Sequence, residues 1–200
     1  MKVLVACEYS GVVRDAFLRR GHSAVSCDLL PCESLNSGDH YQCDVRDLLD
    51  HEWDLMIAHP PCTYLSVSGM HRTTRGLRDP QLTEDALDFV RLLMDADIPR
   101  IAIENPVSVI STRIRKPDQI IQPWQFGHDA SKKTCLWLTN LPPLTPTQII
   151  EPRVVNGKKR WANQTDSGQN RLPPSEDRWK IRSATYRGIA DAMADQWGSL

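Results

Sequence analysis

Short apolar runs alternate with amphipathic stretches through the first half of this 200-residue chain, and this alternation constrains its fold more than any other feature. The apolar runs have the length of buried strands, and the stretches between them place apolar residues three and four positions apart, as helices do. Buried strands that alternate with helices indicate a parallel sheet covered on both faces. We therefore predict an α/β fold with a doubly wound, mostly parallel sheet.

The expected elements follow from these patterns. Strands are predicted over Lys2–Cys7, Ser23–Cys27, Tyr41–Asp44, Asp54–Ala58, Ile101–Glu104 and Cys135–Thr139. Helices are predicted over Val12–Arg20, Thr83–Ala96 and Ala184–Trp197. Residues Glu151–Trp179 show no periodicity and are expected to form a long loop or insertion.

Polar residues follow almost every predicted strand of the first half. In an open parallel sheet, ligands bind at the carboxyl ends of the strands. The residues that fall there are Glu8, Ser10, Asp28, Asp44, Pro60, Pro61, Cys62 and Glu104. Their coincidence at one edge predicts a binding or catalytic site.

Length and composition are those of one globular domain over residues 1–200. No apolar stretch approaches the length of a membrane span, and no protein partner is evident. The six cysteines do not form a dense disulfide pattern, so we expect reduced thiols and a cytoplasmic protein. Cys27, Cys32, His40 and Cys43 are conceivable zinc ligands, but without a Cys-x-x-Cys pair we expect no metal.

Two motifs carry chemistry. His59-Pro60-Pro61-Cys62 follows one apolar strand, and Ile103-Glu104-Asn105-Pro106 ends another. A thiolate can add to carbon 6 of a pyrimidine while a carboxyl group binds ring nitrogen 3, which makes carbon 5 nucleophilic. The plainer readings are a buried structural cysteine and a salt bridge from Glu104 to Arg100 or Arg113.

At these motifs the chain resembles the cytosine carbon-5 DNA methyltransferases, whose catalytic motifs read Pro-Pro-Cys and Glu-Asn-Val; here the second reads Glu-Asn-Pro. The resemblance implies a class I, Rossmann-like methyltransferase fold, with Cys62 as nucleophile and Glu104 as the base-binding acid. Asn105 would orient the loop beside the base. Lys132 and Lys133 stand where the family carries arginines that help to place the base, and they give charge without a planar fork.

The resemblance also implies S-adenosylmethionine as cofactor. Its site would be the first strand-to-helix turn with the ends of the next strands, namely Glu8, Ser10, Gly11, Asp28, Asp44 and Pro60. Asp28 would hold the ribose hydroxyls and Asp44 the adenine amino group. The family usually has three glycines in this turn, whereas only Gly11 is present here.

The expected partner is DNA, double- or single-stranded. The segment Glu151–Arg182 carries eight Lys and Arg against four Asp and Glu, while the whole chain has a net charge of −1. Residues 151–180 would serve as a short recognition region, in which Lys158, Lys159 and Arg160 contact phosphate, Trp161 offers a stacking surface and Asn163 and Gln164 read base edges. The loop after Cys62, with His71, Arg72, Arg75 and Arg78, could close over an extruded base.

Three alternatives remain open: methylation of an exocyclic amine, methylation of a free pyrimidine nucleotide, and a nucleic-acid-binding or decoy module that has lost turnover. His59 and Cys62 argue against the first, and the glycine-poor turn supports the last. A compact enzyme of this kind would suit a phage or mobile element.

Overall fold

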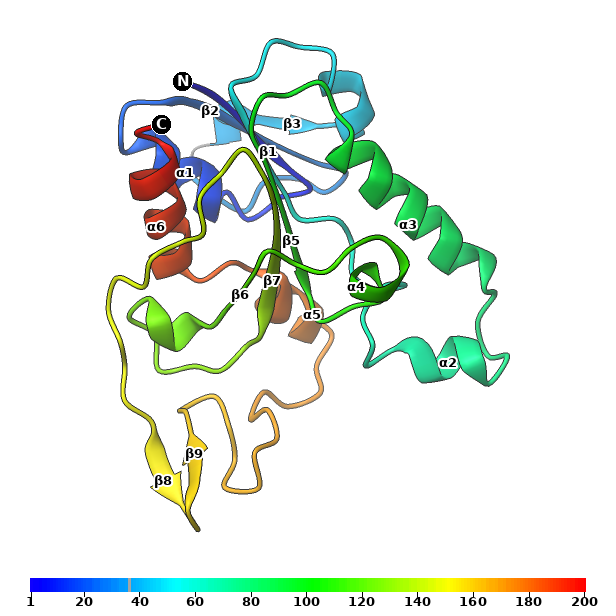
Figure 1. Cartoon of the computed structure of the whole chain (residues 1–200), viewed down its shortest axis with the longest axis vertical. Helices are drawn as coiled ribbons and strands as arrows, with labels where there is room; N and C mark the ends of the chain where they lie inside the picture. The colour runs from blue at the N-terminus through cyan, green and yellow to red at the C-terminus, as the bar shows by residue number, and fades with distance from the viewer. Residues whose placement is uncertain (36) are drawn as a thin grey trace.

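A computed structural model describes residues 1–35 and 37–200 of the chain. Its centre is a seven-stranded sheet with the strand order β3-β2-β1-β4-β5-β7-β6 (Figure 1). The strands are β1 (Lys2–Ala6), β2 (Ser23–Asp28), β3 (His40–Gln42), β4 (Leu55–Ala58), β5 (Ile101–Pro106), β6 (Gln119–Ile121) and β7 (Thr134–Thr139). The first five strands run parallel, whereas β7 is antiparallel to both β5 and β6.

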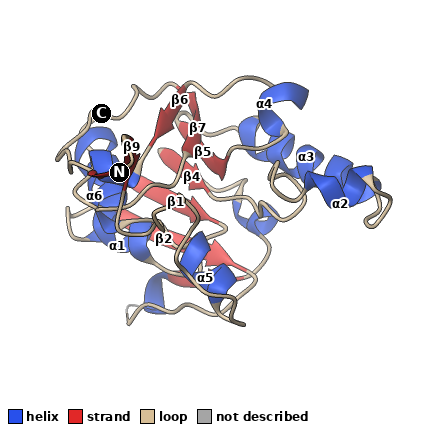
Figure 2. Ribbon diagram, turned by 90° about the horizontal axis from the view of Figure 1, so that it is seen from below, coloured by secondary structure: helices blue, strands red, loops and turns tan. Residues whose placement is uncertain are grey.

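Helices cover both faces of the sheet, as Figure 2 shows. On one face, α1 (Val12–Leu18) and α6 (Arg187–Trp197) pack together, and their apolar residues form a core with alternate residues of β1, β4 and β7. On the other face, α3 (Gln81–Met94) and α4 (Ile110–Arg113) pack on the remaining residues of the same strands. Burial on both faces explains why the central strands are continuously apolar.

Five shorter elements complete this part of the chain. They are the helix α2 (Met70–Thr74), the helix α5 (Arg178–Ser183) and the 3₁₀ turns η1 (Ser37–Asp39), η2 (Val45–Leu48) and η3 (Pro123–Gln125). A separate hairpin of β8 (Arg153–Val155) and β9 (Lys158–Arg160) lies beyond the sheet. None of the helices in the described ranges is both long and apolar enough to cross a membrane.

The strand order confirms the predicted fold class. A doubly wound parallel sheet whose order ends in 5-7-6, with an antiparallel β7, is the Rossmann-like arrangement of the class I methyltransferases. The order changes direction between β1 and β4, and the crevice outside such a switch point is where open α/β sheets bind ligands.

Several predicted boundaries were wrong in the second half. The segment Glu151–Trp179 is not wholly a loop, because it contains the β8–β9 hairpin and the start of α5. The closing helix begins at Arg187 and not at Ala184, and α5 ends just before it. These elements are three to six residues long, except α6, and such short segments carry too few apolar positions for a period to be recognised.

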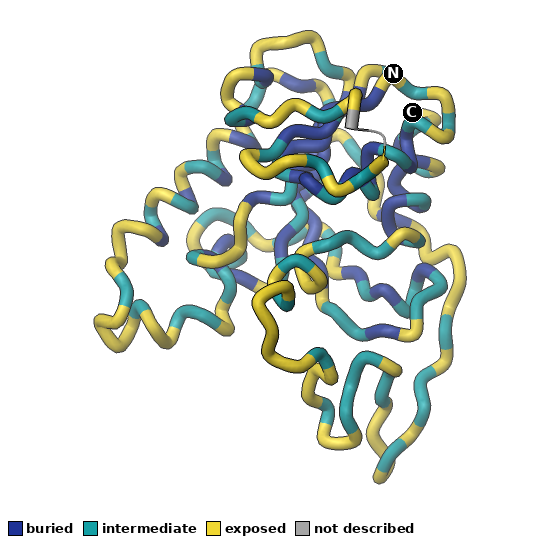
Figure 3. Tube along the Cα trace, turned by 180° about the vertical axis from the view of Figure 1, so that it is seen from behind, coloured by how far each residue is buried: buried dark blue, intermediate teal, exposed yellow. Residues whose placement is uncertain are grey.

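Two segments project from the body. In Figure 1 the β8–β9 hairpin extends below the sheet and α2 lies at the end of an arm on the right. Figure 3 shows that burial is concentrated around the sheet, whereas both projecting segments are largely intermediate or exposed. They lie on the carboxyl side of the central strands, away from the two chain termini.

Candidate active site

Cys62 lies in a tight loop that follows β4. The loop starts where the His59 backbone N–H donates to the Ala6 carbonyl at 2.9 Å, which continues the pairing of β4 with β1. The Cys62 carbonyl then accepts hydrogen bonds from the backbone N–H groups of Leu65 and Ser66 at 3.1 and 2.9 Å. This turn holds the Cys62 side chain at the exposed edge of the sheet, where a substrate can reach it.

Asn105 fixes this loop to the next strand. Its side-chain amide donates a hydrogen bond of 2.8 Å to the Pro60 carbonyl, and the residue is 1% exposed. Loss of this buried bond between strand and loop would cost free energy, because the Pro60 carbonyl would be left unsatisfied. The role predicted for Asn105, orienting the catalytic loop, agrees with this contact, while its proximity to a base stays a prediction.

The strand register brings Glu104 to His59. Ala58 in β4 pairs with Ile103 in β5, so the residues that follow them stand side by side at the carboxyl edge. The His59 Nδ1 and Glu104 Oε2 atoms are 3.0 Å apart, and the two side chains are 11% and 13% exposed. The plainer alternative for Glu104, a salt bridge to Arg100 or Arg113, does not agree with this contact; Arg113 instead pairs with Glu84 at 2.9 Å.

Burial and charge act in opposite directions on this pair. Burial alone raises the pKa of Glu104, but the hydrogen bond from His59 and the positive charge of Lys132 bring the pKa below its usual value. Burial lowers the pKa of His59, but the hydrogen bond and charge of Glu104, with the charge of Glu8, raise it overall. Both shifts favour the pair of an imidazolium and a carboxylate over the neutral pair.

Cys62 faces the same charges. Burial and the negative charge of Glu104 raise the pKa of the Cys62 thiol, while Lys132 and Arg182 oppose this rise. The thiol is thus mostly protonated near neutral pH, and only the thiolate is a nucleophile. Because the charges of Glu104 and Lys132 both act on Cys62, the three side chains lie near one another. The predicted position of the two motifs at strand ends agrees with this.

The antiparallel direction of β7 explains how Lys132 reaches this site. Pro106 at the end of β5 pairs with Thr134 at the start of β7, so residues just before β7 lie at the carboxyl edge. Lys132 lines a small pocket with Glu104, Thr134, Thr185, Tyr186 and Ile189. The charge of Lys133 acts on the thiol of Cys135, which the charge of Glu104 also reaches. The contact of Lys133 with the substrate stays a prediction.

The turn between β1 and α1 is held by Glu8. This buried carboxylate accepts backbone hydrogen bonds from Val13 at 2.7 Å and Arg14 at 3.2 Å, and one from the Ser10 hydroxyl at 3.2 Å. The N-terminal N–H groups of α1 are thus satisfied by the chain itself, which explains how a turn with one glycine is stable. Glu8 and Ser10 act here as a helix cap, and their contact with a cofactor stays a prediction.

Acidic groups gather at the ends of β1, β2 and β3. The pKa of Cys7 is raised by burial and by the charges of Asp28 and Asp44, so these side chains share one region. Asp28 accepts a hydrogen bond from the Leu30 N–H through Oδ1, and burial raises its pKa. The backbone N–H of Leu29 also interacts with this carboxylate and, like that of Leu30, opposes the rise in its pKa.

Asp44 has partners within its own turn. Its carboxylate caps η2 by accepting from the Arg46 N–H at 3.0 Å, and it pairs with the Arg46 guanidinium at 3.3 Å. A negative region fits the positive sulfonium and the hydroxyl donors of S-adenosylmethionine. The contacts of Asp28 with the ribose and of Asp44 with the adenine amino group stay predictions.

The cysteines suggested as zinc ligands have other contacts. Cys27 and Cys43 approach to 3.7 Å between sulfur atoms, while the His40 ring binds the Ser26 hydroxyl and the Leu30 carbonyl. No group of three or more His, Cys, Asp or Glu side chains within the described ranges is arranged to hold a metal.

Helix α5 covers the first turn, which the sequence patterns did not reveal. The Tyr9 hydroxyl and the Ser183 hydroxyl are 2.8 Å apart, and the rings of Tyr9 and Trp179 approach to 5.9 Å. Lys180 pairs with Glu33 at 3.3 Å. Chain segments about 170 residues apart therefore meet above the candidate cofactor region, and no local pattern could have predicted this.

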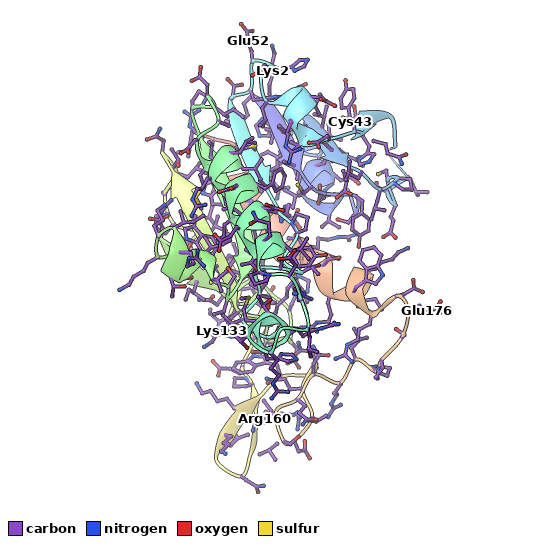
Figure 4. The ribbon with its side chains drawn as sticks, turned by 90° about the vertical axis from the view of Figure 1, so that its right-hand side faces the viewer. Lys2, Cys43, Glu52, Lys133, Arg160 and Glu176 are labelled. Carbon is purple, nitrogen blue, oxygen red and sulfur yellow. The ribbon has the colours of Figure 1, made fainter. Side chains whose placement is uncertain are left out.

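The basic hairpin differs in part from its predicted role. Lys158 and Lys159 are exposed, whereas Arg160 donates to the carbonyls of Asp166 and Lys159 and so holds its own loop (Figure 4). Trp161 stacks on Trp124 with ring centroids 5.7 Å apart.

The two amides expected to read bases are also used internally. The Asn163 side chain bonds the Ser131 backbone twice, and the Gln164 side chain accepts from the Trp161 N–H. The assignment of Trp161, Asn163 and Gln164 to base contacts does not agree with these bonds. The side chains of Lys158 and Lys159 have no such internal partner in the described part of the chain.

The comparisons with known proteins find similar folds and no family. No protein-family model matches the sequence, and no curated protein matches it. One similar solved structure is described as a putative DNA modification methyltransferase encoded within a prophage of E. coli, with 13% identity and a TM-score of 0.47 over 75% of this chain and 52% of that one. Another is the Entamoeba histolytica methyltransferase EhMeth, with 14% identity and a TM-score of 0.48 over 76% of this chain and 58% of that one. The chain thus spans just over half the length of both structures.

Proposed function

We propose that this chain transfers a methyl group from S-adenosylmethionine to carbon 5 of cytosine in DNA. The observation that supports this most is the meeting of an exposed thiol, a buried carboxylate and a lysine at one strand edge, at Cys62, Glu104 and Lys132. These are the groups that covalent activation of a pyrimidine requires.

Each side chain has a role in the proposed reaction. The Cys62 thiolate adds to carbon 6 of the base, and Glu104 supplies a hydrogen bond or proton to ring nitrogen 3, so that electron density reaches carbon 5. Lys132, close to both side chains, offsets negative charge and favours the thiolate. Asn105 keeps the Cys62 loop in place through Pro60. Loss of the carbon 5 proton and departure of the thiolate restore the aromatic ring.

The cofactor contacts proposed here involve Asp28 above all. When bound, S-adenosylmethionine supplies the methyl group as an electrophile. Asp28 would accept hydrogen bonds from the ribose hydroxyls, while Glu8, Ser10 and Gly11 shape the turn beside it. Helix α5 would limit access of water through its contacts with Tyr9.

A covalent trap tests this proposal directly. A fluorine on carbon 5 cannot leave as a cation, so methyl transfer should leave Cys62 bonded to the base. DNA copied with 5-fluorodeoxycytidine triphosphate in place of deoxycytidine triphosphate presents the target whatever its sequence. With S-adenosylmethionine, we expect a denaturant-resistant adduct that mass spectrometry locates at Cys62.

Two variants control the trap. Cys62→Ala should abolish the adduct, whereas Cys43→Ala, which removes a partly buried thiol outside the site, should retain it. Formation of 5-methylcytosine by Cys62→Ala would contradict the proposed mechanism, since no other cysteine of the chain follows the Pro-Pro pair after β4.

The capped first turn supports a second candidate, a nucleic-acid-binding module without turnover. Glu8 already occupies the helix N-terminus, and a ligand carboxylate would compete with it there. Calorimetric titration with S-adenosylmethionine separates the two functions, because a module without turnover need not bind the cofactor. The same trap performed with free 5-fluorodeoxycytidine monophosphate distinguishes a nucleotide substrate from DNA.

A further inference from the structure

His59 has no role in the reaction as described so far, yet it is the closest polar neighbour of the carboxylate. Its Nδ1 atom lies 3.0 Å from Glu104 Oε2. Its Nε2 atom is buried, with no hydrogen-bond partner in the described part of the chain. An unpartnered buried ring nitrogen is costly, so a histidine retained in this position calls for an explanation.

The proposed reaction requires a proton donor beside Glu104, where ring nitrogen 3 of the base would lie. Addition of the Cys62 thiolate to carbon 6 places electron density on nitrogen 3, which must gain a proton. Glu104 in its resting state is ionised, because His59 and Lys132 lower its pKa. An ionised carboxylate has no proton to give, whereas the imidazolium of His59 in contact with it does.

We propose that His59 is a positioning residue that stores the proton for Glu104, so that the two side chains act as one acid. This rests on the proposed function and deepens it. When thiolate addition begins, the proton passes from His59 Nδ1 to the Glu104 carboxylate, and the carboxyl group gives a proton to nitrogen 3. Carbon 5 then forms its bond to the methyl group and loses its own proton to solvent. After the thiolate leaves, nitrogen 3 returns a proton to the pair. The balance closes without any further reactant.

The charges around the pair favour this arrangement. Glu8, from the turn after β1, stabilises the imidazolium, while Lys132, before β7, disfavours it and favours the carboxylate; Asp28, at the end of β2, also interacts with the His59 charge. Movement of the proton to Glu104 removes the negative charge that raises the pKa of Cys62. The same proton transfer therefore makes Glu104 a proton donor and favours the thiolate of Cys62.

Hydrogen exchange at carbon 5 measures the addition of Cys62 to the base and the protonation of nitrogen 3, and it does not require the cofactor. Reversible addition of Cys62 makes carbon 5 exchange with deuterium from solvent, and this can be followed on DNA by mass spectrometry. We expect His59→Asn, which donates to Glu104 but carries no titratable proton, to slow exchange about 100-fold, the lower end of what general acid–base catalysis contributes. His51→Asn, an exposed histidine at the other end of the sheet, should leave the rate unchanged.

The pH profile distinguishes proton storage from a purely structural role. The wild-type rate should rise with pH while His59 is protonated, because the Cys62 thiolate increases. It should level off between the pKa of His59 and the higher pKa of Cys62, and fall above both as the remaining imidazolium is lost. In His59→Asn the alkaline fall should disappear. His59→Ala should be partly rescued by added imidazole, which can enter the vacated space and carry a proton.

Nuclear magnetic resonance of ¹⁵N-labelled histidines gives a readout that needs no substrate. The His59 signal, assigned as the one missing among six in His59→Asn, should titrate above the usual histidine range in the wild type and at lower pH in Glu104→Gln. If His59 titrates at the same pH in Glu104→Gln as in the wild type, Glu104 does not hold the proton of His59, and the proposed proton storage by this pair is wrong.

The outcomes separate the two proposals. An active wild type with an equally active His59→Asn and the same alkaline fall would overturn the role of His59 and leave the proposed function intact. A wild type without carbon 5 exchange or methylation, on DNA with cytosine in every sequence context, would overturn the proposed function and the role of His59 with it.

Discussion

At the scale of single residues, Glu104 has two opposing effects on the site. As a carboxylate it raises the pKa of Cys62 and so suppresses the nucleophile, but the proposed reaction needs it beside the base. Lys132 reduces this conflict, because it favours both the carboxylate and the thiolate. When a base binds and the proton of His59 moves to Glu104, the carboxylate charge that suppresses the Cys62 thiolate is removed. Suppressing the thiolate also limits oxidation of Cys62, since the susceptibility of a cysteine to oxidation follows its thiolate character.

Asp28 is the residue on which cofactor affinity should depend most. We expect Asp28→Asn to weaken S-adenosylmethionine binding by about 1.5–3 kcal/mol, the usual scale for hydrogen bonds to a charged group. Isothermal titration calorimetry measures this directly. Asp54→Asn removes a carboxylate from the opposite edge, where it accepts from the Lys2 N–H, and should leave the affinity unchanged. Equal affinities for Asp28→Asn and the wild type would remove Asp28 from the cofactor site.

At the scale of elements, the β1–α1 turn shows how one glycine can replace several. Gly11 has a φ of 72°, and a Cβ built there would lie 2.6 Å from Arg14 Nη2 and 2.7 Å from Ser34 Cβ. Arg14 is fully buried, where it bonds Ser26 and Asp15. The glycine is thus required both by backbone conformation and by close packing, while Glu8 satisfies the helix N-terminus.

Gly11→Ala should therefore be more destabilising than the backbone alone explains. Left-handed backbone costs a non-glycine residue about 1–2 kcal/mol, and displacement of Arg14 adds to this. Gly21→Ala is the matched control, because Gly21 has a φ of 80° and a Cβ added there would meet nothing within 4 Å. Urea unfolding of both variants gives the comparison. If the two lose the same stability, the Arg14 contact does not limit the residue at position 11.

The sequence could predict those parts of the site that depend on strand ends. Cys62, Glu104 and Asp28 follow apolar runs, and the parallel arrangement of such runs places their ends at one edge. The contact of His59 with Glu104 depends on the register between β4 and β5, which no run of residues encodes by itself. The antiparallel β7, which brings Lys132 to the edge, and α5, which covers Tyr9, are products of long-range packing and could not be predicted from local periodicity.

At the scale of the whole molecule, charge is unevenly distributed between the two ends. Lys2 and Glu52 form an ion pair at the end of the molecule where the strands begin (Figure 4). Figure 4 shows Arg160, in the β8–β9 hairpin, at the opposite end. The hairpin projects beyond the edge that holds Cys62, and Lys158 and Lys159 are exposed there. A DNA strand bound at this edge would pass beside these two lysines.

Replacement of Lys158 and Lys159 together by Ala should weaken DNA binding and reduce its salt dependence. Each phosphate contact on duplex DNA contributes a slope of about 0.9 in the logarithm of affinity against the logarithm of salt, so the double variant should lose up to about 1.8. Arg160 is left in place because it holds the hairpin loop, and its loss would confuse binding with folding. Lys2→Ala, at the opposite end, should change neither quantity. Fluorescence anisotropy over a range of salt concentrations provides both. If the double variant keeps the affinity and the slope of the wild type, the hairpin does not contact DNA, and methylation of a free nucleotide becomes the better proposal for this site.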